Sequence, residues 1–162
     1  MPPKIILIGY GNPGRTDDGL GPALAAKIEA RSVRGLSVEV DYQLVVEHAH
    51  EIANYDAVIF ADSAIRGESP FSFSEIQSIH QPNFSSHSLS PDTVLFIAQT
   101  MFHAKTKAYV LGIRGYEFGE FGERLSEHAK TNLEAAFEFI LKTVQSEGWL
   151  GNSYPEYRPN GA

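Results

Sequence analysis

The sequence contains no cysteine and carries little positive charge, and these two absences exclude several classes of protein. Without cysteine there is no disulfide framework, no thiolate metal site and no cysteine nucleophile. Thirteen lysine and arginine residues against twenty acidic residues give a formal net charge of −7. Nucleic acids and anionic membranes bind basic surfaces, so neither is expected as a partner. The lack of cysteine also agrees with a cytoplasmic location, which is our expectation.

Long apolar runs are missing at the N-terminus as well. The run at residues 5–8 is too short for a signal peptide or a membrane span. Apolar residues make up 43% of the 162 residues and charged residues 20%, which is typical of a globular domain of this size. No repeat or linker divides the chain. We therefore predict one domain over residues 1–147 and a flexible, dispensable tail over residues 148–162.

Strand-like and helix-like segments alternate along the chain. This alternation predicts an α/β protein, with a three-layer α/β/α fold around a twisted, mostly parallel sheet of about five strands, as in phosphorylase/hydrolase-like folds. The strands are expected at residues 5–8, 36–41, 55–62 and 107–113, with an edge strand at 71–79. The helices are expected from residue 18 or 19 onward and at residues 44–53, 91–102 and 126–147.

The first predicted strand leads into a glycine-rich turn that carries two adjacent aspartates. The spacing of its glycines matches Gly-x-Gly-x-x-Gly, the dinucleotide-binding pattern. In that pattern the helix N-terminus faces a pyrophosphate, whereas here Asp17 and Asp18 would repel phosphate. Nucleotide binding is therefore not expected, and the glycines are interpreted as positions of positive φ or close backbone approach.

Acidic residues follow three of the predicted strands. Asp17 and Asp18 come after the first strand, Asp41 ends the second and Asp62 ends the third. Ligands of parallel α/β sheets bind beyond the carboxyl ends of the strands, so these side chains are expected to converge. His87, in the loop before the next helix, can reach the same edge. Two carboxylates and one imidazole suit a divalent transition metal.

Each of these residues also has a structural interpretation. Asp17 and Asp18 would favour a helix dipole, Asp41 could end a strand or support another ligand, and a surface position is common for a loop histidine such as His87. The other histidines are expected to be structural or solvated; they are His48, His50, His80, His103 and His128.

The turn resembles the opening of two protein families. The stretch from Gly11 to Gly14 after an apolar strand resembles the peptidyl-tRNA hydrolases. That family follows the turn with a catalytic histidine, whereas no histidine precedes His48 here, and an acidic chain suits tRNA badly. This resemblance is a remote alternative.

The second resemblance is closer and covers about residues 4–145. Gly-x-Gly-Asn at residues 9–12, Asp-Asp-Gly-x-Gly at 17–21, an aspartate ending the third strand and a later loop histidine resemble the hydrogenase maturation endopeptidases. This family removes a short C-terminal extension from the precursor of the nickel-iron hydrogenase large subunit after nickel insertion. The resemblance implies that this precursor is the partner. We expect the chain to act as a monomer.

The resemblance also implies the site. Asp18, Asp62 and His87 would contact nickel that the substrate supplies as a recognition element, with no permanent cofactor. Asp18 and Asp62 are the catalytic candidates of an aspartic-type or metal-dependent endopeptidase. Metal-activated water, or Asp17 or Asp41 as general base, remain alternatives for the attack.

One segment departs from the family's pattern. Members often have an acid followed by two glycines after the second strand, whereas residues 41–44 here are Asp-Tyr-Gln-Leu. The departure leaves open which precursor is accepted. A carrier or chaperone of the large subunit, which binds the precursor without cutting it, is the alternative from a different functional class.

Overall fold

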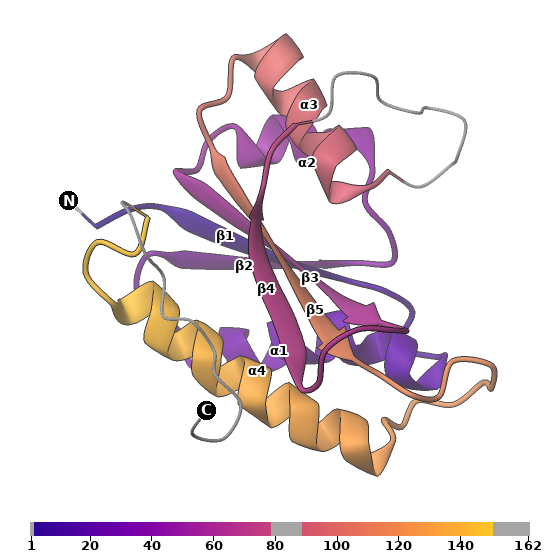
Figure 1. Cartoon of the computed structure of the whole chain (residues 1–162). Coiled ribbons are helices and arrows are strands. Elements are labelled where there is room, and N and C mark those ends of the chain that lie inside the picture. The colour runs from indigo at the N-terminus through magenta and orange to yellow at the C-terminus, as the bar shows by residue number, and fades with distance from the viewer. Residues whose placement is uncertain (1, 79–88, 151–162) are drawn as a thin grey trace.

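The computed structural model describes residues 2–78 and 89–150. Five strands form one twisted sheet in the order β2–β1–β3–β5–β4 (Figure 1). Neighbouring strands are parallel except for β4, which runs antiparallel to β5 at one edge. The strands are β1 (Ile5–Tyr10), β2 (Leu36–Asp41), β3 (Ala57–Ala64), β4 (Phe71–Ile76) and β5 (Lys107–Arg114).

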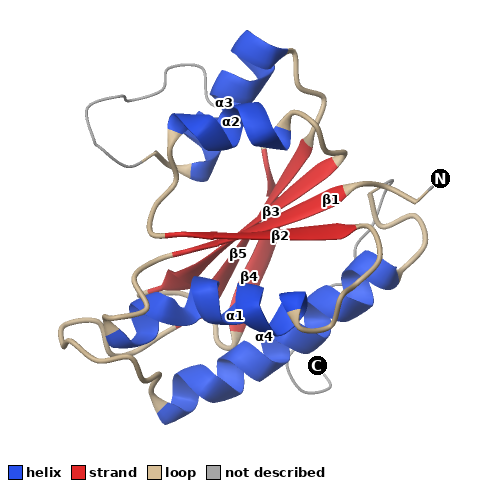
Figure 2. Ribbon diagram, turned by 180° about the vertical axis from the view of Figure 1, so that it is seen from behind, coloured by secondary structure: helices blue, strands red, loops and turns tan. Residues whose placement is uncertain are grey.

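Helices cover both faces of the sheet. Figure 2 shows α1 and α4 on one face and α2 and α3 on the other. The predicted three-layer α/β/α fold with a mostly parallel sheet is confirmed. The helices are α1 (Leu20–Glu29), α2 (Val46–Ile52), α3 (Pro91–Phe102) and α4 (Glu127–Gln145), and a 3-10 helix, η1 (Thr16–Gly19), precedes α1. In the described part of the chain, no helix combines the length and the apolar character needed to cross a membrane.

One apolar core lies on each side of the sheet. In β1, Ile5 and Leu7 pack with α1 and α4, whereas Ile6 and Ile8 pack with α2 and α3. Burial on both faces explains the continuous apolar run of this central strand. In β3 the residues Val58 and Phe60 lie on the α2/α3 side. Because side chains alternate along a strand, the same face of the sheet receives the side chain at position 62.

Three element boundaries differ from the prediction. The third strand was expected to end at Asp62 but continues to Ala64, because its last three residues pair with β5. The helix expected from residue 18 or 19 begins at Leu20, so both aspartates of the turn lie in η1. The edge strand ends at Ile76, and residue 79 lies outside the described residues.

The chain remains packed beyond residue 147, where the flexible tail was expected to begin. Trp149 is 3% exposed and packs against Tyr109 of β5, with ring centroids 5.1 Å apart. Burial of a large aromatic ring offsets the loss of chain entropy over a short connection. The predicted domain boundary is therefore too early, and the packed domain includes Trp149. Residues 151–162 lie outside the described residues.

Replacement Trp149→Ala is expected to lower the free energy of unfolding by about 2–4 kcal/mol, since it removes a buried ring from the core. Trp149→Phe keeps most of the contact and should cost less than about half as much. Urea denaturation followed by circular dichroism measures both. An unchanged urea denaturation midpoint for Trp149→Ala would show that residues after 147 do not stabilise the domain, as the predicted boundary implied.

Candidate functional site

Glycines bring the opening turn and α1 unusually close to the sheet. A Cβ atom on Gly21 would lie 2.4 Å from the carbonyl oxygen of Tyr10 and 2.5 Å from that of Ala61. Gly11 has φ of +139°, and a Cβ atom there would lie 2.1 Å from the carbonyl oxygen of Asp18. Only glycine fits at these positions without a shift of the backbone. The close approach holds η1 at the carboxyl ends of β1 and β3.

Asp18 and Asp62 lie near each other at this edge. Oδ2 of Asp18 accepts a hydrogen bond of 2.8 Å from the backbone N–H of Asn12, and Oδ1 of Asp62 accepts one of 2.7 Å from that of Ser63. Burial raises the pKa of Asp62 to about 6, and the charge of Asp18 adds to this rise. The structure thus brings together two of the three predicted metal-contacting residues. The third, His87, lies outside the described residues.

A cavity of about 540 Å³ opens beside Asp62, between the sheet and the first turn of α3. Tyr10, the last residue of β1, lines this cavity beside Asp62. Burial, together with the Asp62 carboxylate, raises the pKa of the Tyr10 hydroxyl far above its usual range, so this group remains a proton-bearing donor. The cavity is lined by Tyr10, Asp62, Ser63, Ala64, Ser72, Ile76, Gln77, Pro91, Asp92, Val110 and Gly112.

Asp17 is fully buried, and its carboxylate is hydrogen-bonded to the loop 115–126 between β5 and α4. Its Oδ2 accepts hydrogen bonds from the backbone N–H groups of Tyr116 (2.8 Å) and Glu117 (3.0 Å) and from Oγ of Ser126 (2.6 Å). Its Oδ1 accepts one from the N–H of Ser126 (2.8 Å). Burial alone would raise the pKa of Asp17, but the hydrogen bonds from Ser126, Glu117 and Tyr116 outweigh it and lower the pKa below its usual value.

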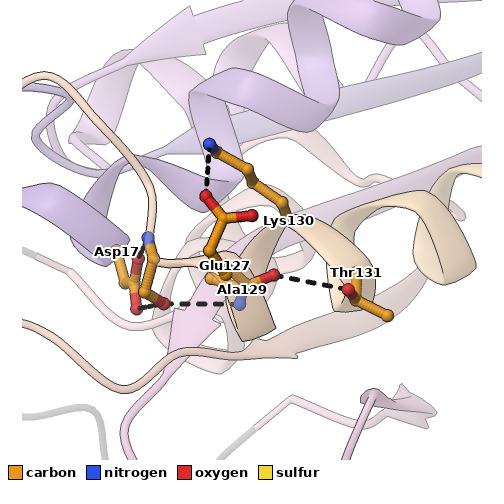
Figure 3. A network of polar contacts seen from close by, with 6 residues as sticks. Asp17, Glu127, Ala129, Lys130 and Thr131 are labelled. Atoms are coloured by element: carbon orange, nitrogen blue, oxygen red, sulfur yellow. Dashed lines mark hydrogen bonds and ion pairs between the residues drawn. The ribbon is translucent and has the colours of Figure 1, made fainter.

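The loop 115–126 is therefore joined to the opening turn. Ser126, which contacts Asp17, also caps α4 by accepting a 3.3 Å hydrogen bond from the N–H of Ala129 (Figure 3). Two backbone hydrogen bonds of 2.8 Å, from Thr16 to Gly122 and from Gly122 to Gly14, complete the connection. Asp17 thus holds two distant segments together next to Asp18.

Asp41 lies in a separate acidic group on the α2 side of β2. Its Oδ2 is 3.5 Å from Nε2 of His48, and Oε1 of Glu39 is 3.8 Å from the same nitrogen. The ring of His48 is buried, and its Nδ1 accepts a 2.9 Å hydrogen bond from the N–H of Val45 at the start of α2. Burial, and then the neighbouring Glu51, raise the pKa of Glu39 to about 7. His48 was expected to be either structural or solvated, and its burial and hydrogen bond show that it is structural.

Tyr10 is the site residue that sequence reasoning missed. The available signal was its place in β1, where alternation with Ile6 and Ile8 puts it on the same face as Asp62. Within residues 2–78 and 89–150, no three acidic or histidine side chains are arranged to hold a metal ion. Carboxylate oxygens nevertheless suit a divalent cation, and Asp18 with Asp62 supplies two such ligands.

Sequence comparison gives no match to a protein-family model and none to a curated protein. Solved structures do match over most of the chain. The NiFe hydrogenase maturation protease HycI from Thermococcus kodakarensis KOD1 superposes with a TM-score of 0.69 at 21% identity, covering 88% of this chain and 93% of that one.

Two further structures agree. The hydrogenase maturating endopeptidase HybD from E. coli gives a TM-score of 0.62 at 20% identity, covering 86% of this chain and 90% of that one. The hydrogenase 2 maturation peptidase from Thaumarchaeota archaeon SCGC_AB-539-E09 gives 0.64 at 18% identity, covering 88% and 98%. The fold implied by the resemblance of the opening motif is confirmed: this chain has the fold of the hydrogenase maturation proteases.

Proposed function

We propose that this chain is an endopeptidase that removes the C-terminal extension from the nickel-loaded precursor of a nickel-iron hydrogenase large subunit. The observation that carries the proposal is the meeting of Asp18 and Asp62 at the carboxyl edge of the sheet, beside a cavity of about 540 Å³. The fold shared with maturation proteases and the Asp-Asp-Gly-x-Gly motif support it. A cytoplasmic, monomeric protein is part of the proposal.

Nickel carried by the precursor is the recognition element in this proposal. Asp18 and Asp62, together with His87 from the family resemblance, would contact the metal and orient the peptide bond in the cavity. A precursor that lacks nickel forfeits these contacts and binds more weakly. Because the substrate supplies the metal, the protein needs no permanent cofactor.

The proton chemistry of peptide hydrolysis requires a base for the attacking water and an acid for the leaving nitrogen. Asp17 fits neither role, since its carboxylate is buried and occupied by four donors and its pKa is lowered. Asp62 contacts the substrate's nickel in this proposal, and a carboxylate beside a divalent cation is held ionised, so the pKa of about 6 applies to the protein before substrate binds. We therefore assign the orientation of the metal and of the peptide bond to Asp18 and Asp62, and exclude Asp17 from the proton transfer.

The test is incubation of the purified protein with nickel-loaded precursor, followed by intact-mass measurement. We expect the precursor to lose a C-terminal peptide, and nickel-free precursor to keep its full length. A precursor that binds but keeps its length would instead identify the protein as a carrier or chaperone.

A further inference from the structure

Tyr10 and Asp62 are neighbours across two parallel strands. In the register of β1 and β3, Gly9 pairs with Ala61, so the next residue of each strand lies at the same level of the sheet. Both side chains lie on the α2/α3 face, and both line the cavity of about 540 Å³. The sheet therefore places a phenol ring beside the Asp62 carboxylate inside the cavity.

The contacts of the Asp62 carboxylate come from two directions. Ser63 donates to Oδ1 from its backbone N–H at 2.7 Å and from its Oγ at 3.5 Å, and the Tyr10 phenol lies beside the carboxylate on the adjacent strand. Both Ser63 bonds are local to β3. Tyr10 belongs to a separate strand, whose backbone Gly21 approaches so closely that a Cβ atom there would lie 2.4 Å from the Tyr10 carbonyl oxygen. A donor on the adjacent strand, added to the two of Ser63, would restrict the orientation of the carboxylate.

We propose that Tyr10 is a positioning residue that holds the Asp62 carboxylate in the orientation needed to grip the substrate's nickel. The inference rests on the proposed function and extends it to a residue that does not itself contact the substrate's metal. Carboxylates that bind metals are generally held by outer hydrogen bonds, and loss of such a partner costs about 10–100-fold in affinity or activity. Tyr10 supplies that outer hydrogen bond here.

Tyr10→Phe tests the proposal, because it removes the hydroxyl and keeps the ring that lines the cavity. The affinities of the variant and of the unmodified protein are measured for a cleavage-resistant precursor, once loaded with nickel and once without it. We expect the affinity of Tyr10→Phe for nickel-loaded precursor to fall about 10–100-fold and its affinity for nickel-free precursor to stay unchanged. With cleavable precursor, the same variant should raise KM more than it lowers kcat.

Tyr55→Phe is the matched control. It makes the same chemical change before the amino end of β3, outside the cavity lining, and should leave both affinities unchanged. Thermal unfolding of both variants verifies that the fold survives.

Three results would overturn the inference. Equal nickel-loaded affinities for Tyr10→Phe and the unmodified protein would remove the role of the hydroxyl. Equal losses for nickel-loaded and nickel-free precursor would show a structural role only. If the unmodified protein bound nickel-loaded and nickel-free precursor equally, the proposed function itself would fail. The inference alone fails when the unmodified protein prefers nickel-loaded precursor and Tyr10→Phe shows the same preference.

Discussion

Asp62→Asn is expected to reduce processing of nickel-loaded precursor by about 10³-fold while the protein stays folded. The asparagine side chain keeps the size of the carboxylate but loses its charge, so it cannot grip the metal as the carboxylate does. Removal of a single group that stabilises the transition state commonly costs about 10²–10³-fold.

The same substitution should make the protein more stable at pH 8. Burial raises the pKa of Asp62 to about 6, so its ionised form is disfavoured in the folded state. This penalty is absent below the pKa of the unfolded chain, about 4, and is complete above the folded value of about 6. Asp62→Asn removes the penalty and should raise the free energy of unfolding by about 3 kcal/mol at pH 8, but not at pH 3.

Intact-mass kinetics and urea denaturation at the two pH values measure these effects. Asp56→Asn is the control, because Asp56 lies before the amino end of β3 and its carboxylate accepts an exposed 2.8 Å hydrogen bond from the backbone N–H of Lys4. Processing by Asp62→Asn at the rate of the unmodified protein would disprove the role of this carboxylate.

Asp17→Asn is expected to lower the free energy of unfolding by about 2–4 kcal/mol. Both oxygens of the carboxylate accept hydrogen bonds, from Tyr116, Glu117 and Ser126. An asparagine must place its NH₂ group against at least one of these donors, which leaves a buried donor unpaired and weakens the charge-assisted bonds that remain. The loss is a large fraction of the total stability of a typical domain.

The pH dependence of this effect has a defined sign. The pKa of Asp17 is lowered in the folded state, so its contribution is present above the pKa of an unfolded aspartate, about 4, and is lost as the pH falls further. The stabilities of the two proteins should therefore converge below pH 4. Urea denaturation at pH 7 and at pH 2.5 measures this, and amide exchange at Tyr116, Glu117 and Ser126 should accelerate in the variant at pH 7.

Asp18→Asn is the matched control for this experiment. Asp18 is partly exposed and accepts one hydrogen bond, from the N–H of Asn12, which an asparagine oxygen can still accept. We expect its unfolding free energy to change by less than about 1 kcal/mol while processing is lost. If Asp17→Asn proved as stable as Asp18→Asn, the assignment of separate roles to the two neighbours would be wrong.

The fold was predictable because its signals are local. The apolar run of β1, the alternation in β2 and the proline at the start of α3 each indicate an element from neighbouring residues. Boundaries were less predictable: β3 runs past Asp62 because its last residues pair with β5, which local sequence does not reveal.

The placement of the acidic site residues was also predictable from the sequence. A carboxylate that follows a parallel strand must lie at the carboxyl edge of the sheet, so the approach of Asp18 to Asp62 followed from their places in the chain. The packing of Trp149 against Tyr109 and the contact of Tyr10 with Asp62 were not predictable, because each depends on strands or segments that are distant in sequence.

The glycine-rich opening turn shows which features the sequence determines and which depend on the tertiary structure. Its residues alone require a tight, acid-bearing connection from a buried strand to a helix, since glycine permits the backbone and the apolar run demands burial. They do not distinguish the functions of Asp17 and Asp18, which are chemically identical neighbours. That distinction comes from donors on residues 116, 117 and 126, about 100 positions later, which surround one carboxylate and leave the other at the edge of the sheet with Asp62.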